Sequence, residues 1–146
     1  MGVRLNISDA SLLIQRGYGN IKAAQALAQY ESPSCTPHET SWLKRERDDY
    51  FFRAFRNLGE MSAILLPRKV GEMDIDYVRH KKSCELIAKA MELGRLFIIP
   101  SENIKRRREL FTQMEVGLKA FQGADIDLFK NFIHEFSVYV TRDMTR

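Results

Sequence analysis

Residues 36–66 read TPHETSWLKRERDDYFFRAFRNLGEMSAILL, and this stretch predicts one long helix. Thr36 is a good N-cap, Pro37 suits the first helical position, and Glu39 completes a capping box. Apolar side chains then recur every three or four residues and predict a broad core face made of Leu43, Tyr50, Phe51, Ala54, Phe55, Leu58 and Leu65. The helix must end near Pro67, because a proline disfavours helical backbone in the residue before it.

Cap and breaker residues divide the rest of the chain into four more helical segments. The predicted helices cover residues 8–30, 75 to 94 or 98, 101–122 and 125–141. Their limits are set by Ser8, Asp74, Pro100, Ser101, Gly123 and Asp125. Gly17 and Gly19 weaken the middle of the first helix enough that it could break in two. Before it, alternating apolar residues predict that residues 1–7 form an extended N-terminal arm.

Each later segment carries an apolar stripe at helical spacing. The predicted stripes are Cys84, Ile87, Ala88 and Met91 in the third helix, Ile104, Phe111, Met114, Leu118 and Phe121 in the fourth, and Phe129, Phe132, Ile133, Phe136 and Val140 in the fifth. Short connections make consecutive helices antiparallel neighbours. The sequence therefore predicts an all-α fold, a compact bundle of four to five mostly antiparallel helices that forms a single domain over residues 1–146.

Composition narrows the class of protein without identifying a function. Apolar residues make up 45% of the 146 residues and charged residues 29%, which is typical of a globular protein. The net charge of +4 permits an anionic partner without requiring one. The longest apolar runs, Ala63–Leu66 and Leu96–Ile99, are too short to span a membrane, and the first residues do not resemble a signal peptide. We therefore expect a cytoplasmic protein that does not associate with a membrane.

Four residues have the chemistry of zinc ligands. Cys35 and His38 are separated by two residues, and His80 and Cys84 lie four apart, on one face of the third helix. A metal-binding sensor is one hypothesis for this set. The alternative is that Cys84 is buried in the core while the histidines are solvated, and chance placement explains the spacing. We expect no metal and no cofactor.

Two groups of basic residues are candidate binding sites. Lys105, Arg106, Arg107 and Arg108 open the fourth helix, where they would bind phosphates or pair with nearby glutamates on a solvated face. Four consecutive residues point in all directions around a helix, so they cannot make one flat patch.

The second group lies on the long second helix. Arg45, Asp49, Phe52 and Arg56 form a stripe away from the predicted core face, and the candidate binding residues here are Arg45, Phe52, Arg53 and Arg56. A phenylalanine ring on a charged stripe is expected to be shielded from water by a contact. That contact would come from another helix of the chain, a second subunit, or a ligand or nucleic acid.

No sequence motif indicates catalysis. The chain has no nucleophile elbow and no phosphate-binding loop, and neither cysteine has an activating neighbour. The sequence therefore favours a non-catalytic accessory or assembly module that binds a protein partner or its own copies through helical faces. The alternative is a nucleic-acid-binding protein with weak sequence specificity that uses the two basic helices.

Overall fold

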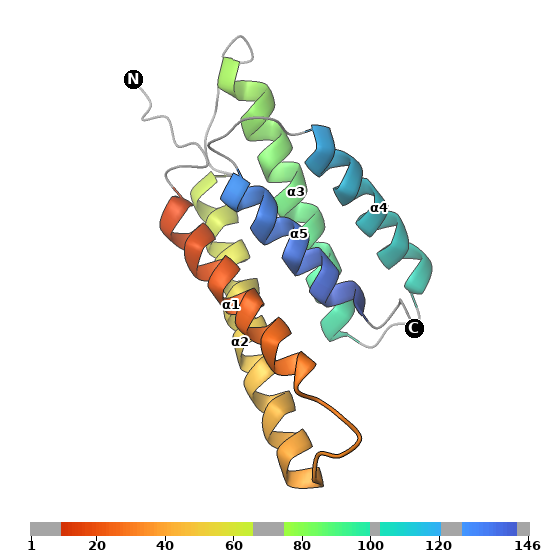
Figure 1. Cartoon of the computed structure of the whole chain (residues 1–146). Coiled ribbons are helices and arrows are strands. Elements are labelled where there is room, and N and C mark those ends of the chain that lie inside the picture. Colours follow the sequence, from red (N-terminus) through yellow and green to blue (C-terminus); the bar gives the residue numbers. More distant parts are fainter. Residues whose placement is uncertain (1–9, 66–74, 100–102, 121–126, 143–146) are drawn as a thin grey trace.

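The computed structural model describes residues 10–65, 75–99, 103–120 and 127–142, and all of its regular structure there is helical (Figure 1). The five helices are α1 (Ser11–Gln29), α2 (Pro37–Leu65), α3 (Ile75–Ile98), α4 (Ile104–Ala120) and α5 (Asp127–Thr141). The predicted all-α bundle is confirmed. The predicted arm at residues 1–7 and the caps or breakers at Ser8, Pro67, Asp74, Pro100, Ser101, Gly123 and Asp125 lie outside the described residues.

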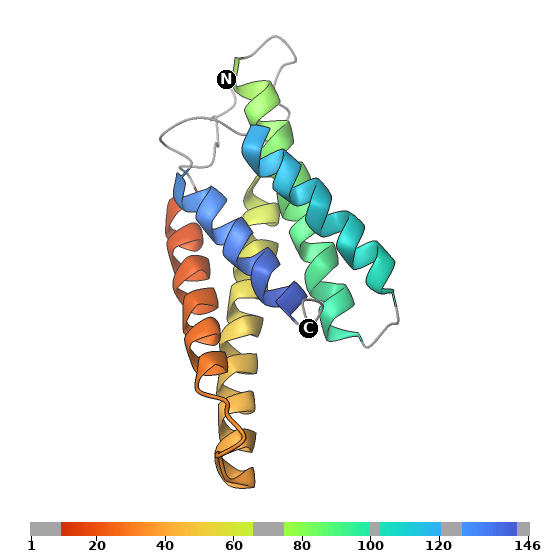
Figure 2. The ribbon, with the colours of Figure 1, turned by 45° about the vertical axis from the view of Figure 1, so that its right-hand side comes forward.

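Consecutive helices run in opposite directions along the bundle (Figure 1). α1 packs against α2 and α5, while α3 packs against α2, α4 and α5. α4 also contacts α5, so α5 lies among three other helices. Figure 2 shows α2 between α1 and α3, with the lower part of the α1–α2 hairpin extending beyond the other three helices. At 29 residues, α2 is about 44 Å long and α5 about 22 Å, which is why the hairpin projects.

The predicted start of α2 is correct, with one difference in the cap. Thr36 Oγ1 accepts a hydrogen bond from the backbone N–H of Glu39 at 3.1 Å. The carboxylate of Glu39 accepts from the Thr36 hydroxyl at 3.0 Å. In a standard capping box this carboxylate would bind the backbone N–H of the cap residue. The cap still satisfies one of the free donors at the helix start and defines where α2 begins.

Phe51 of α2 lies at the centre of the aromatic core and is 1% exposed. Its ring stacks on Phe136 and Tyr139 of α5, with ring centroids 5.7 and 5.6 Å away. The ring of Phe97 from α3 meets it edge-on at 5.2 Å. Each such pair contributes about 0.5–1.5 kcal/mol beyond the burial of apolar area. One side chain of α2 thus connects three helices.

The predicted core stripes are confirmed to different degrees. The whole α5 stripe is buried, and in α2 the same is true of Leu43, Phe51, Ala54 and Leu58, whereas Tyr50 and Phe55 are half-buried. In α3, Ile87 is buried, Cys84 and Met91 are half-buried, and Ala88 is exposed, so its inclusion was wrong. Leu86, Ala90 and Leu93 take the inward positions instead. The Leu65 side chain lies outside the described set.

The α4 stripe was predicted correctly at Met114 and Leu118, which are buried, but not in the first turns of the helix. Ile104 is 46% exposed and Phe111 is half-buried, whereas Arg107 and Leu110 are buried beside Met114 and Leu118. An apolar pattern alone cannot assign a core position to an arginine, so the prediction placed Ile104 and Phe111 in the core instead of Arg107 and Leu110. Phe121, its last member, is outside the described residues.

Glycines inside two helices allow aromatic rings to approach the backbone. A Cβ at Gly17 would lie 2.4 Å from Cζ of Phe132, and one at Gly94 would lie 2.4 Å from Cε2 of Phe55. These contacts explain why glycine occupies both positions, and α1 continues through Gly17 as α3 does through Gly94. Both glycines are packing positions, and neither breaks its helix.

The two glycines of α1 should respond to alanine in opposite ways. Gly17→Ala should lower the free energy of unfolding by about 1–2 kcal/mol, because the buried ring of Phe132 must shift. Gly19→Ala should raise it by about 0.5–1 kcal/mol, since no atom lies within 4 Å and alanine favours the helix. Urea denaturation of both variants measures the difference. Equal effects would show that Phe132 does not pack on α1 as described.

Candidate interaction surface

One face of α2 is exposed along most of the helix. It consists of residues spaced by three or four positions: Trp42, Arg45, Asp49, Phe52, Arg56, Glu60 and Ala63. We call these seven residues the α2 outer face. Trp42 and Phe52 are each 49% exposed. Trp42 lies in the second turn of α2, near the end of the helix that projects beyond α3, α4 and α5 (Figure 2).

Phe51 and Phe52 are adjacent in sequence but lie on different faces of α2. Successive residues of a helix are about 100° apart, so only Phe51 can point into the core. The Phe52 ring is tilted by 60° to that of Phe51, with centroids 5.5 Å apart, and about half of Phe52 is exposed to solvent. The prediction that Phe52 lies apart from the core face is therefore correct, and no helix of the described chain buries it.

Charged side chains surround Phe52 on the helix surface. Arg53 forms an ion pair with Asp49 at 2.9 Å, and its guanidinium lies 5.3 Å from the centre of the Tyr50 ring. Arg45 and Arg56 are exposed and form no ion pair with any residue that the structure describes. Aromatic residues and arginine are both enriched in interfaces between proteins.

A groove of about 470 Å³ adjoins this face, between α1 and α2. It is lined by Arg16, Gly19 and Asn20 of α1 and by Arg53, Arg56, Asn57 and Glu60 of α2. Asn20 donates a hydrogen bond to the buried Asn57 side chain at 3.0 Å, which fixes the floor of the groove. Sequence reasoning did not include Arg16 or Glu60. Arg16 and Asn20 are four residues apart and so lie on the same face of α1, and this spacing is the feature of the sequence that could have indicated the groove.

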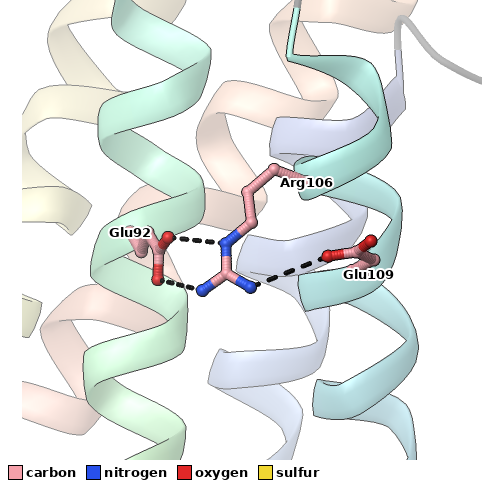
Figure 3. A network of polar contacts seen from close by, with 3 residues as sticks. All are labelled: Glu92, Arg106 and Glu109. Carbon is pink, nitrogen blue, oxygen red and sulfur yellow. Dashed lines mark hydrogen bonds and ion pairs between the residues drawn. The ribbon is translucent and has the colours of Figure 1, made fainter.

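Arg106 of the α4 basic run is engaged in an ion pair between helices. Its Nε and one terminal nitrogen donate to the two carboxylate oxygens of Glu92 on α3, at 2.9 and 3.1 Å (Figure 3). Glu109, one turn along α4, lies 3.8 Å from the other terminal nitrogen. This bidentate ion pair connects α4 to α3, so the guanidinium of Arg106 is already engaged in a contact within the fold.

Arg107 is 6% exposed and belongs to the core. Its guanidinium donates to the backbone carbonyl of Val140 on α5 and lies 6.0 Å from the centre of the Phe97 ring of α3. Lys105 and Arg108 are exposed. The basic run therefore presents two of its four side chains to solvent, and Arg107 is unavailable to a ligand.

The four candidate metal ligands lie in separate parts of the fold. Cys35 is in the α1–α2 loop and His38 in the first turn of α2, at the opposite end of the bundle from the start of α3 (Figure 1). Cys84 is half-buried in α3, and burial, with a smaller effect of Glu85, raises the pKa of its thiol and disfavours the thiolate that binds metals. The side chain of His80 lies outside the described set. No three His, Cys, Asp or Glu side chains in the described ranges could hold a metal ion together.

The basic run should divide into structural and dispensable positions. Arg107→Ala should lower the free energy of unfolding by about 2–3 kcal/mol, because it leaves the buried Val140 carbonyl without its charged donor. Arg108→Ala, at an exposed position of the same helix, should change it by less than about 0.5 kcal/mol. Thermal denaturation of both variants checks this. Equal stability of the two would contradict the buried placement of Arg107.

Comparison with known proteins does not identify a relative. No protein-family model matches the chain, and no curated protein or solved structure is significantly similar to it. Of the helices in the described part of the chain, none is both long and apolar enough to cross a lipid bilayer.

Proposed function

We propose that this protein is a non-catalytic helical assembly module that binds a protein partner or its own copies through the α2 outer face. The observation that carries the proposal is the half-exposed ring of Phe52 in the middle of a long helix whose opposite face builds the core. Free energy is gained by removing apolar area from water, at about 25 cal/mol per Å². A partner that covers this ring would gain that energy, whereas the core does not depend on its exposed side.

The composition of the α2 outer face also supports a protein partner. Trp42 and Phe52 supply two large rings, and Arg45 and Arg56 supply charged groups that reach across an interface. Aromatic residues and arginine are the side chains that most often contribute strongly to binding between proteins. Trp42 lies about 15 Å from Phe52 along the helix, so both rings fit under one partner helix.

Nucleic-acid binding is the second candidate function. The groove beside Phe52 brings Arg16 close to Arg53 and Arg56, and a base could stack on the exposed ring. The structure also weakens this candidate, because Arg106 pairs with Glu92 and Arg107 is buried. Two arginines of the α4 basic run are therefore engaged in the fold, and the protein partner is favoured.

Removal of the Phe52 ring should weaken assembly while the bundle stays folded. Phe52→Ala should raise the dissociation constant of the complex by about tenfold, which is typical of an aromatic residue at the centre of an interface. Sedimentation velocity measures self-association, and quantitative mass spectrometry of co-purifying proteins measures binding to other partners. The matched control is Val116→Ala, at an apolar side chain of α4 that is 64% exposed.

Each result of this experiment has a distinct meaning. Loss of association in Phe52→Ala but not in Val116→Ala supports the proposal. If the two variants behave like the unmodified chain in both measurements, the α2 outer face is not a protein interface. If Phe52→Ala instead weakens binding of a single-stranded oligonucleotide at low salt while protein association is unchanged, nucleic-acid binding replaces the proposal.

A further inference from the structure

The charges of the α2 outer face are complementary to the same face read in reverse. Arg45 and Glu60 are equally far from the midpoint between Phe52 and Arg53, and Asp49 and Arg56 are equally far from it as well. Each pair joins opposite charges. Trp42 and Ala63 form a third equidistant pair, in which a large exposed side chain corresponds to a small one. A reversed copy of the helix is therefore a chemically matched partner.

A two-fold axis places such residues opposite each other. When two copies of a helix pack antiparallel around that axis, residues equally far from the midpoint lie at the same height on the two helices. Arg45 of one copy then lies level with Glu60 of the other, and Asp49 level with Arg56. At the centre, Phe52 of one copy lies level with Arg53 of the other; Arg53 borders the α2 outer face, and an arginine packs well on an aromatic ring. By symmetry, every charge pair occurs twice.

Two other antiparallel alignments of the helices bring like charges together. Moving the midpoint back to between Tyr50 and Phe51 sets Arg45 level with Arg56. Moving it forward to between Ala54 and Phe55 sets Asp49 level with Glu60 and Arg53 level with Arg56. A parallel pair places every charge beside its own copy. Like charges facing each other in an interface are strongly unfavourable. Within the α2 outer face, only the alignment centred between Phe52 and Arg53 sets both Arg45 level with Glu60 and Asp49 level with Arg56.

We infer that the partner of the α2 outer face is a second copy of this chain, with the two α2 helices antiparallel around the midpoint between Phe52 and Arg53. This inference rests on the proposed function and names its partner. The helix is exposed from Trp42 to Ala63 along this face, a length of about 33 Å. One helix pair of that length is a small interface, so we expect a dissociation constant of about 1–100 μM. Added salt should raise this constant, because it screens the charge pairs.

Charge reversal tests the alignment directly. Asp49→Arg alone sets two arginines level with each other, and Arg56→Asp alone sets two aspartates level with each other. Each single variant should self-associate at least about tenfold more weakly than the unmodified chain. A mixture of the two should form a heterodimer, because both pairs of opposite charge are then restored. Sedimentation velocity across micromolar to submillimolar concentrations measures all three samples, and circular dichroism checks that each variant folds.

A second mixture controls for general attraction between oppositely modified chains. Arg45→Glu changes the net charge by the same amount as Arg56→Asp. When it is mixed with Asp49→Arg, however, the expected alignment sets the arginine introduced at position 49 level with Arg56. The same alignment sets the glutamate introduced at position 45 level with Glu60, so this mixture should not recover association. Equal recovery in both mixtures would show that net charge, and not alignment, drives pairing, and would overturn the inference.

The inference can fail while the proposed function stands. A chain that stays monomeric over the whole concentration range, yet retains co-purifying proteins through Phe52, binds a different partner. A dimer that depends on Phe52 but not on residues 49 and 56 uses another alignment. Either result overturns the antiparallel α2 pair, whereas loss of all dependence on Phe52 overturns the proposed function itself.

Discussion

The packing of the Phe51 ring is the contact on which the rest of the structure depends. This α2 ring stacks on the rings of Phe136 and Tyr139 of α5, and the ring of Phe97 from α3 meets it edge-on. Two guanidinium groups, those of Arg107 and Arg142, lie against the outer rings of this cluster. Burial raises the pKa of the Tyr139 hydroxyl more than the nearby Arg142 lowers it, so the tyrosine stays neutral within the core. The cluster fixes the rotation of α2 about its own axis.

Fixing that rotation determines what α2 presents to solvent. With Phe51 directed inward, Phe52 must lie about 100° away, and the charged residues in register with it form one continuous exposed face. The groove beside α1 follows from the same rotation, because Arg53, Arg56 and Glu60 then border Arg16. The core and the proposed interface are thus consequences of one constraint, which links the stability of the bundle to the geometry of assembly.

Sequence reasoning succeeded where local chemistry determines the structure. Thr36, Pro37 and Glu39 mark the start of α2, and the apolar residues of α5 are dense enough that only one face can be the core. It failed where a contact with a residue distant in the sequence determines which side chain is buried or where a helix ends. Ile104 and Phe111 were the apolar choice for α4, but Arg107 takes the buried position because Val140 and Phe97 lie opposite it. Gly94 was read as a possible helix end, although the ring of Phe55 uses it as a packing site. The exposure of Phe52 was predictable from spacing, whereas the groove required α1 and α2 to be placed side by side.

Measuring the distance between the two copies of α2 tests the antiparallel α2 pair most directly. Nitroxide spin labels can be placed through Ser41→Cys, Glu46→Cys or Gly59→Cys in a chain with Cys35→Ser and Cys84→Ala, and distances are then measured by pulsed electron resonance. In the antiparallel pair, labels at positions 46 and 59 should give equal separations of about 20 Å along the helix axis, and a label at position 41 should give about 35 Å. Equal short distances at all three positions would indicate a parallel pair. The absence of any distance between molecules at concentrations where the protein sediments as a dimer would show that α2 is not the interface.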